Sequence, residues 1–247
     1  MGHGDAMHLT GFIPGSDKLQ VWCCHENRKD GSSFRDAATG KVLFQVPMNQ
    51  DVGRCMAADI DPTNEGVEMF AGYQSKKARP QLNANGNQSL SWMEAADGIL
   101  NYKGEVIANN VSSMSYNMAV WWDGDLLREL LDKNEVSKYD WREKKFDIIK
   151  VFEGVEWNNG TKANPCLMGD LVGDWREEVL MRTPDSNYMR LYVTTIPTEY
   201  RFHTFLTDPV YRIDIATQNV AYNQPPHTGF YFGPDLEGVF RGYVIKK

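Results

Sequence analysis

The sequence lacks several features that would place it in a familiar class of protein. It has no run of about 18 apolar residues, so we expect no transmembrane helix and no membrane partner. Lys and Arg number 26 against 33 Asp and Glu, and the net charge of −7 argues against nucleic acid as a partner. The first ten residues, MGHGDAMHLT, lack the basic and apolar regions of a signal peptide, so export would need an upstream segment.

Cysteine is also scarce. The four cysteines are Cys23, Cys24, Cys55 and Cys166, and none shows the C-x-x-C spacing of a zinc site. Cys23 and Cys24 lie in an apolar run. We therefore interpret the cysteines mainly as buried thiols, and a disulfide could form only in an oxidising compartment.

What the sequence does contain is a succession of short strands in a chain long enough to bury a substantial core. Alternating apolar residues, many of them β-branched or aromatic, predict strands at 18–24, 41–47, 67–72, 146–152, 177–183, 189–195, 212–218 and 238–245. Polar turns predict hairpins at 35–44, 100–108 and 182–193. The leucines of 124–135 also fit a helix, but the surrounding pattern favours a strand, and we predict an all-β fold.

A loose internal repeat lies over these strands. Asp5, Asp59, Asp123 and Asp170 each stand near a small residue and ahead of a strand, roughly 50 to 60 residues apart. That spacing fits the four-stranded blades of a β-propeller. Because the period is irregular, a β-sandwich remains the alternative.

Closely spaced carboxylates accompany two of these repeats. Asp59, Asp61 and Glu68 form one set, and Asp170, Asp174 and Glu178 form another. Hard oxygen ligands on tight loops suit Ca²⁺, which takes six to eight oxygens in irregular geometry. Solvated acidic turns are the alternative for any single loop, but the recurrence favours calcium in a structural role.

Histidines gather near the N-terminus. His3, Asp5 and His8 could meet at a metal or an acidic sugar, and His25 could join them after the first strand. Asp5 and His8 are therefore candidate metal ligands, and His25 is a candidate substrate contact. The alternative for each histidine is an ordinary hydrogen-bonded structural residue, which is our interpretation of His203 and His227.

Two loops have the composition of a sugar-binding surface. Lys162 follows the turn formers Asn158, Asn159 and Gly160, which would place a lone cation on a loop tip. In 218–233, amides and aromatics such as Tyr222 and Asn223 surround Pro225 and Pro226. Aromatic rings stack on sugars and amides pair with hydroxyls, whereas a rigid closing turn is the alternative. Arg79 is a further candidate, as a clamp on a substrate carboxylate.

Several ordered blocks resemble the rhamnogalacturonan lyases of polysaccharide lyase family 11. They are GHGDAMHL, ADIDPTNEGVEMF, AVWWDGDLLRELLD, NNGTK, GDLVGDWREEVLMRT and DPVYRIDIATQNVAYNQPPHTGFYFG, spread over nearly the whole chain. The resemblance implies an eight-bladed β-propeller with bound calcium. It also implies β-elimination between rhamnose and galacturonate in pectic rhamnogalacturonan-I, leaving a 4,5-unsaturated galacturonate.

The same resemblance implies roles for individual residues. Lys162 and Tyr222 correspond to the candidate catalytic pair, with the choice of base between them left open. Asn159, Gly160 and Thr161 correspond to substrate contacts.

The chain resembles only the C-terminal part of the family's catalytic domain, as a single partial propeller of four to five blades over residues 1–247. Thr10 and Phe12 stand where the second repeat has Asp59 and Asp61, so the calcium loop of the first repeat is eroded. Open strand edges would pair with a second copy or another chain. The family resemblance implies a secreted or cell-surface protein.

Two other functions remain open from the sequence. The first is a non-catalytic carbohydrate-binding or calcium-stabilised scaffold. The second is a calcium-dependent adhesion module, which gives no reason for the N-G-T-K turn or the Pro-Pro loop.

Overall fold

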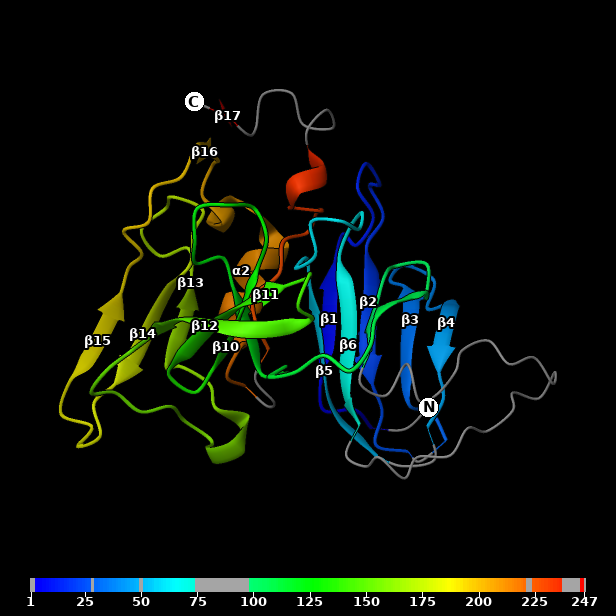
Figure 1. Cartoon of the computed structure of the whole chain (residues 1–247), viewed down its shortest axis with the longest axis horizontal. Helices are drawn as coiled ribbons and strands as arrows, with labels where there is room; N and C mark the ends of the chain where they lie inside the picture. The colour runs from blue at the N-terminus through cyan, green and yellow to red at the C-terminus, as the bar shows by residue number, and fades with distance from the viewer. Residues whose placement is uncertain are drawn as a thin grey trace.

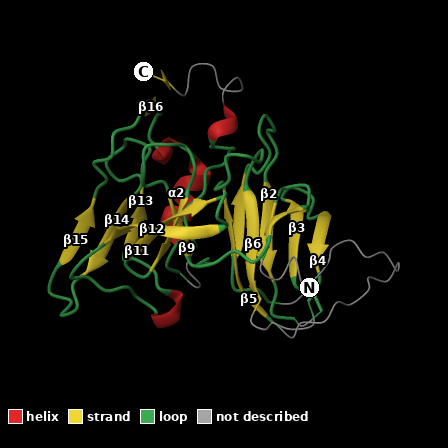
Figure 2. Cartoon of the chain, in the orientation of Figure 1, coloured by secondary structure: helices red, strands yellow, loops and turns green. Residues whose placement is uncertain are grey.

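A computed structural model describes residues 3–27, 29–48, 51–73, 98–220 and 224–236, together with the backbone of 245–246. Strands dominate the fold (Figure 2), so the predicted all-β class is confirmed. In the described part of the chain, no helix has the length and apolar character needed to cross a bilayer.

The described strands form five antiparallel sheets in which each main sheet uses consecutive strands. The first sheet contains β1 (Met7–Thr10), β2 (Gln20–Cys24), β3 (Ser32–Asp36) and β4 (Val42–Val46); the second contains β5 (Val52–Ala58), β6 (Glu68–Tyr73), β7 (Ile99–Leu100) and β8 (Val106–Ala108). The third contains β9 (Met118–Val120), β10 (Glu129–Asp132), β11 (Glu135–Asp140) and β12 (Lys145–Val151); the fourth contains β13 (Leu167–Gly169), β14 (Glu178–Arg182) and β15 (Met189–Tyr192). A short pair joins β16 (Tyr200–Arg201) to β17 (Ile245–Lys246), and the helical segments are η1 (Gly160–Lys162), η2 (Phe205–Thr207), α2 (Pro209–Thr217) and η3 (Pro234–Leu236).

Neighbouring sheets pack face to face in chain order. Figure 1 shows the sheet of β1–β4 at one side and that of β13–β15 at the other, with β9–β12 between them. Met56 and Phe70 of the second sheet share a buried cluster with Leu130 of the third, and Leu131 of the third shares another with Val179 of the fourth. The second and third sheets therefore each pack against the sheet before and the sheet after them in the chain.

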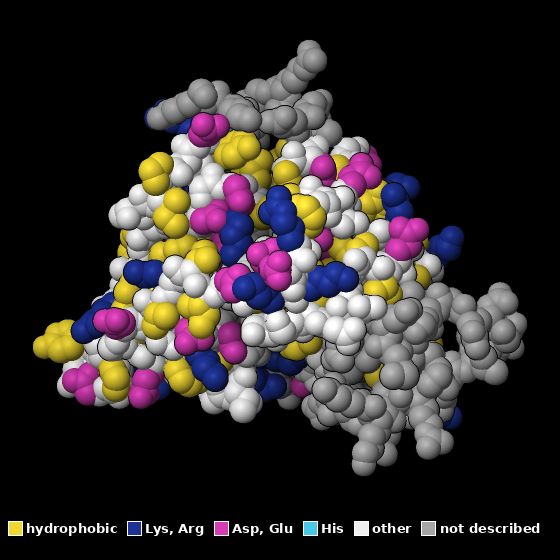
Figure 3. Space-filling model, in the orientation of Figure 1, with side chains coloured by type: hydrophobic (Ala, Val, Ile, Leu, Met, Phe, Trp, Pro, Cys, Tyr) yellow, Lys and Arg dark blue, Asp and Glu magenta, His cyan; other side chains and the backbone are white. Residues whose placement is uncertain are grey.

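The surface carries charges of both signs. In the face drawn in Figure 3, acidic and basic side chains are interspersed over its middle, where β11 and β12 lie in Figure 1. No single sign dominates that face.

Most of the predicted strands and all three predicted hairpins are present. The hairpins at 35–44, 100–108 and 182–193 are β3–β4, β7–β8 and β14–β15. The ambiguous segment 124–135 leads through a loop into β10, which pairs with β9 and β11. Residues 237–244, which make up most of the strand predicted at 238–245, lie outside the described residues.

The strand predicted at 212–218 is wrong, because this segment belongs to helix α2. Asp208 caps the helix through its side chain, which accepts a hydrogen bond from Val210 N at 3.1 Å, and Pro209 stands at the first helical position. Tyr211 is buried, whereas Ile213 is exposed. The alternation of Arg212, Ile213 and its neighbours resembled a strand, but the cap and the burial of Tyr211 favour a helix.

The loops that follow the first strand of each main sheet share one hydrogen-bond pattern. In each case the side chain of the first residue of the second strand accepts a hydrogen bond from a backbone N–H of the loop. Glu68 Oε2 accepts from Ile60 and Asp61, Glu129 Oε2 from Trp122 and Asp123, Glu178 Oε2 from Leu171 and Val172, and Gln20 Oε1 from Phe12. This pattern aligns the four repeats more accurately than the aspartates do.

The alignment corrects part of the repeat read from the sequence. Asp59 and Asp170 are equivalent, and Gly11 rather than Thr10 stands at the same place in the first repeat, because Thr10 pairs with Gln20 as Ala58 pairs with Glu68 and Gly169 with Glu178. Asp123 is instead equivalent to Asp61. Asp5 does not belong to the series, because it precedes β1 and so lies at the other end of that strand.

Candidate active site

The candidate site lies where the first strands of the four main sheets begin. Asp5 stands just before β1, Arg54 is near the start of β5, Asn117 directly precedes β9, and Lys162 lies in the turn ahead of β13. Since these strands pack side by side, residues far apart in the sequence meet at this end. The carboxylates of Glu68, Glu129 and Glu178 belong to loops at the opposite ends of the first strands.

Lys162 is presented by a tight turn. Asn159 has φ 57°, Gly160 has φ 58° and Ala163 has φ 46°, so the turn uses the left-handed region three times. Lys162 N donates to Asn159 O at 3.1 Å, and the Trp157 indole donates to Gly160 O at 3.0 Å. These contacts fix the turn and leave Lys162 partly exposed, with 31% of its side chain accessible.

A series of polar contacts ties the turn to the other sheets. Lys162 Nζ lies 3.9 Å from Asp5 Oδ2. Asn117 Nδ2 donates to Thr161 O at 3.2 Å, and Arg54 Nη2 donates to Asn117 Oδ1 at 3.1 Å. Lys162, Thr161 and Asp5 are therefore brought together, with Arg54 as a second cation nearby.

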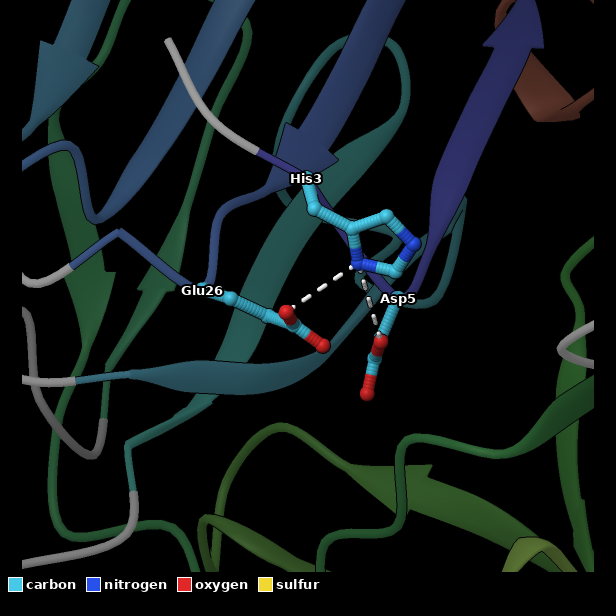
Figure 4. Close-up of side chains that lie close together, drawn as sticks. All are labelled: His3, Asp5 and Glu26. Carbon is cyan, nitrogen blue, oxygen red and sulfur yellow. Dashed lines mark ion pairs between the residues drawn. The ribbon is translucent and has the colours of Figure 1, made fainter.

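Asp5 also belongs to a group with His3 and Glu26, shown in Figure 4. His3 Nδ1 lies 3.1 Å from Glu26 Oε2 and 4.0 Å from Asp5 Oδ1. One ligand atom from each of these residues falls within 4.8 Å of the others, a spacing that could hold a metal ion. Asp5 Oδ1 is buried and has no hydrogen-bond partner among the described residues.

The electrostatics of the site favour unusual protonation states. Burial raises the pKa of Asp5, and its hydrogen bond with Glu26 raises it further. Burial lowers the pKa of Lys162, and the nearby positive charge of Arg54 adds to that effect. Asp5 and Glu26 act in the opposite direction on Lys162 but do not cancel the shift. A lysine with a lowered pKa is a better base near neutral pH than a free one.

Three predicted site residues, Arg79, Tyr222 and Asn223, lie outside the described residues. The described flanks of the Tyr222 loop are nevertheless anchored near the site. Asn164 Nδ2 donates to Asn219 Oδ1, and Asn219 Nδ2 donates to Cys166 O at 2.9 Å, both just after the Lys162 turn. On the other side, Gln224 Oε1 accepts from Met7 N at 3.0 Å, two residues after Asp5.

Two of the predicted histidines do not reach the site. His8 is buried, and both of its ring nitrogens are engaged, with Cys55 O at 2.9 Å and His227 Nε2 at 2.9 Å. No nitrogen of His8 is left to bind a metal together with Asp5. His25 is buried as well, with its Nε2 lying 2.8 Å from Ser33 Oγ, so its side chain offers little surface to a substrate.

The acidic loops at the other end do not gather their carboxylates as the sequence predicted. Among the described residues, neither Asp59, Asp61 and Glu68 nor Asp170, Asp174 and Glu178 form a group with one oxygen each within 4.8 Å. Asp174 pairs instead with Arg176 at 2.7 Å. Four carboxylate oxygens in these loops are nevertheless buried without a hydrogen-bond partner in the described structure: Asp59 Oδ1, Glu68 Oε1, Asp170 Oδ1 and Glu178 Oε1.

Sequence reasoning missed three residues of the site, Arg54, Asn117 and Glu26. Arg54 was detectable as a charged residue in the otherwise apolar strand 52–58. Asn117 and Glu26 stand in ordinary polar loops, and nothing local distinguishes them. Their place in the site depends on which strand ends meet.

Comparison with known proteins gives consistent matches. The family described as rhamnogalacturonan lyase family 11, C-terminal domain, matches residues 1–241. The chain is 48% identical over 238 residues to the rhamnogalacturonan endolyase YesW of Bacillus subtilis (strain 168), covering 96% of this chain and 34% of that protein. It is 43% identical over 247 residues to the rhamnogalacturonan exolyase YesX of the same organism, covering 96% of this chain and 38% of that protein.

Solved structures agree with the sequence matches. A Bacillus licheniformis rhamnogalacturonan lyase PL11 superposes with a TM-score of 0.83 at 45% identity, covering 98% of this chain and 37% of that one. The crystal structure of YesW superposes with a TM-score of 0.81 at 47% identity, covering 94% and 36%. The chain thus spans about a third of the length of the relatives it matches. On these matches, the chain belongs to rhamnogalacturonan lyase family 11 and corresponds to its C-terminal domain.

Proposed function

We propose that this chain carries catalytic residues of a lyase that cleaves pectic rhamnogalacturonan by β-elimination. The names of its relatives support this substrate. One observation carries the proposal: the N-G-T-K turn brings Lys162 to 3.9 Å from Asp5, beside the group of His3 and Glu26. Removal of a weakly acidic proton from a uronate needs a base with a positive charge nearby. A lysine of lowered pKa beside candidate metal ligands offers that arrangement.

The reaction moves one proton and breaks one bond. A base takes the proton from C5 of galacturonate, the electrons of that bond form the C4=C5 double bond, and the C4–O bond breaks. The departing oxygen gains a proton from an acid. We assign Lys162 and Tyr222 to this pair without fixing which is the base. Asn159, Gly160 and Thr161 are proposed as substrate contacts beside Lys162.

We propose calcium at three places where carboxylate oxygens are available. His3, Asp5 and Glu26 offer one set, and Asp5 Oδ1 is buried without a partner among the described residues. The loops of Glu68 and Glu178 each contain buried carboxylate oxygens that also lack a hydrogen-bond partner among the described residues. At the first place, a bound Ca²⁺ would supply positive charge for the uronate carboxylate; in the two loops, it would neutralise buried carboxylates.

We further propose that the four main sheets are consecutive blades of a β-propeller that this chain only partly completes. The support is their order, since each sheet uses consecutive strands and packs on its neighbours. The remaining blades would come from a further segment, another chain or a second copy. A polymeric pectic substrate also fits a secreted or cell-surface protein.

Replacing Lys162 by Ala tests the catalytic proposal. The chain, alone and mixed with the part of YesW that it does not cover, is incubated with rhamnogalacturonan-I and calcium. The ultraviolet absorbance of the unsaturated product is then followed. We expect Lys162→Ala to lower the rate by about 10²-fold or more, because a proton-transfer group is lost. The free energy of unfolding should change by no more than about 0.5 kcal/mol.

Lys150→Ala is the matched control, because Lys150 is exposed on the outer strand β12 and is not among the residues of the site. It should leave the rate unchanged. Full activity in Lys162→Ala would contradict the role of Lys162.

A non-catalytic carbohydrate-binding module is the second candidate. It is favoured by the fact that the chain spans only about a third of the relatives' length. If neither the chain nor the mixture forms unsaturated product but the chain binds the polysaccharide by calorimetry, this second function replaces the first.

A further inference from the structure

We propose that the ammonium group of Lys138 takes the place of a divalent cation in the loop between β9 and β10. This loop is then held by the protein's own charge and binds calcium only when Lys138 is removed. The proposal goes beyond the proposed function, although it compares this loop with two that we propose to hold calcium.

The contacts of Lys138 are those of a cation in a carboxylate cage. Lys138 projects from β11, and its Nζ donates to Asp123 Oδ2, to Asp125 Oδ2 at 2.7 Å and to Glu129 Oε1 at 3.0 Å. An ammonium group has three hydrogens and no acceptor, so three carboxylates use all of its donors. Asp123, Asp125 and Glu129 are also one of the two described groups whose ligand atoms lie close enough to hold a metal.

The equivalent loops supply an independent observation. Glu68, Glu129 and Glu178 all use Oε2 to accept from two successive backbone N–H groups of their loops. Their other oxygens differ. Glu129 Oε1 accepts from Lys138, whereas Glu68 Oε1 and Glu178 Oε1 are buried with no hydrogen-bond partner in the described part of the chain. All three side chains are 0% exposed, and burying a carboxylate oxygen without a partner is costly.

The first repeat shows what a loop without a cation looks like. There the equivalent position is Gln20, a neutral amide, and Gly11 and Ile13 stand where the second repeat has Asp59 and Asp61. A loop without buried carboxylate charge needs no cation. The four repeats therefore follow one rule: a buried glutamate at this position requires a positive partner, and in the third repeat that partner is Lys138.

Lys138 remains protonated among these carboxylates. Burial disfavours the charged ammonium, but Glu129 and Asp125 more than offset this, so the pKa of Lys138 is raised above its usual value. Its distances to Asp125 and Glu129, 2.7 and 3.0 Å, exceed the 2.3–2.6 Å typical of calcium ligands. A small inward movement of these side chains would therefore suit calcium once the ammonium is gone.

Lys138→Ala tests this exchange directly. Calcium bound per chain is measured by isothermal titration calorimetry and by metal analysis after dialysis. Thermal unfolding is followed in chelator and in millimolar calcium. We expect one more calcium equivalent in Lys138→Ala than in the wild type. We also expect an unfolding midpoint that is lower in chelator and rises with calcium. Lys150→Ala, the control, should match the wild type in both measurements.

A second pair of variants keeps the test decisive if Lys138→Ala does not fold. Glu68→Gln and Glu129→Gln change equivalent positions, and Gln20 shows that the fold accepts glutamine there. Glu68→Gln should lose one calcium equivalent, whereas Glu129→Gln should lose none.

Two outcomes would overturn the role of Lys138: an unchanged calcium content in Lys138→Ala, or a lost equivalent in Glu129→Gln. A wild type that binds no calcium while Lys138→Ala binds one would instead refute only the proposed calcium in the other loops.

Discussion

Two histidines at the centre of the molecule, His8 and His227, take their protonation states from the groups around them. Cys55 O can only accept, so His8 Nε2 carries a hydrogen and donates to it. His8 Nδ1 then accepts from His227 Nε2, and His227 Nδ1 accepts from Arg128 Nη1 at 3.3 Å. Each acceptor fixes the next donor, so both rings are neutral and each has a single tautomer.

The free energy of unfolding should therefore depend on pH through His8. Burial lowers the pKa of His8 to about 4 from its ordinary value of 6.5. The unfolded chain binds a proton below pH 6.5 that the folded chain refuses until about pH 4, so stability is complete above pH 6.5 and falls as pH decreases toward 4. We expect His8 to contribute a loss of about 3 kcal/mol over this range, measured by urea unfolding at successive pH values.

The pH dependence of the wild type must be compared with that of variants. Carboxyl groups whose pKa is raised in the fold make the protein more stable on acidification, which opposes the effect of His8. Asp214, whose pKa burial raises to about 6, gains relative stability on acidification. The wild type is therefore compared with His8→Gln, which removes the titrating ring, and with His203→Gln, which changes an exposed histidine. The slope should flatten only in His8→Gln, and an unaltered slope there would show that His8 is not responsible.

At the scale of elements, helix α2 joins the fold to the Pro-Pro loop. Asp208 accepts from Val210 N through Oδ1 and from Gly229 N through Oδ2. One carboxylate thus caps the helix and holds the chain that follows the Tyr222 loop. Tyr211 on the same helix donates to Glu177 Oε1 at 2.7 Å, which fixes α2 against the loop between β13 and β14.

Asp208→Ala should reduce the free energy of unfolding by about 2–3 kcal/mol. Loss of the cap accounts for about 1 kcal/mol, and the unpaired N–H of Gly229 accounts for the rest. Asp208→Asn is the matched variant, because its carbonyl oxygen still caps Val210 while its amide cannot accept from Gly229. Denaturant unfolding should place it between the wild type and Asp208→Ala; equal losses in both variants would argue against the second contact.

At the scale of the whole molecule, the four main sheets form an open series. Polar contacts through its centre join them, since Arg128 Nη2 donates to Ala119 O and, at 3.1 Å, to Glu177 Oε2. The last main sheet has three strands in the order β13, β14, β15. Its outer strand and flanks expose Tyr188, Met189, Leu191 and Val193, at 71%, 65%, 47% and 45% of their surface.

An apolar sheet edge of this kind should make the isolated chain self-associate. We expect the apparent mass in light scattering after gel filtration to rise with protein concentration. Leu191→Lys should lower that association, because a charge on the edge strand opposes further pairing. Ile213→Lys is the control, since Ile213 is more exposed than Leu191 and lies on another element, α2. Equal effects of both changes would indicate nonspecific contact rather than pairing at β15.

Much of the fold could be predicted because strand periodicity reports burial locally. Alternating side chains between packed sheets predicted most of the described strands and all three hairpins, and the ordered sequence blocks indicated the family. Helix α2 escaped the same reasoning, because Arg212 to Ile215 alternate as a strand would. Its helical form depends on the Asp208 cap and on the buried position of Tyr211.

The sequence by itself determined the elements, their order and the type of chemistry, since these follow from the local spacing of residues. Tertiary structure decided which of those residues meet. Asp5 lies beside Lys162 because β1 and β13 begin at the same end of the packed sheets, and Lys138 reaches Glu129 because β11 pairs with β10. Contacts between distant residues depend on the packing of whole sheets, which no short stretch of sequence encodes.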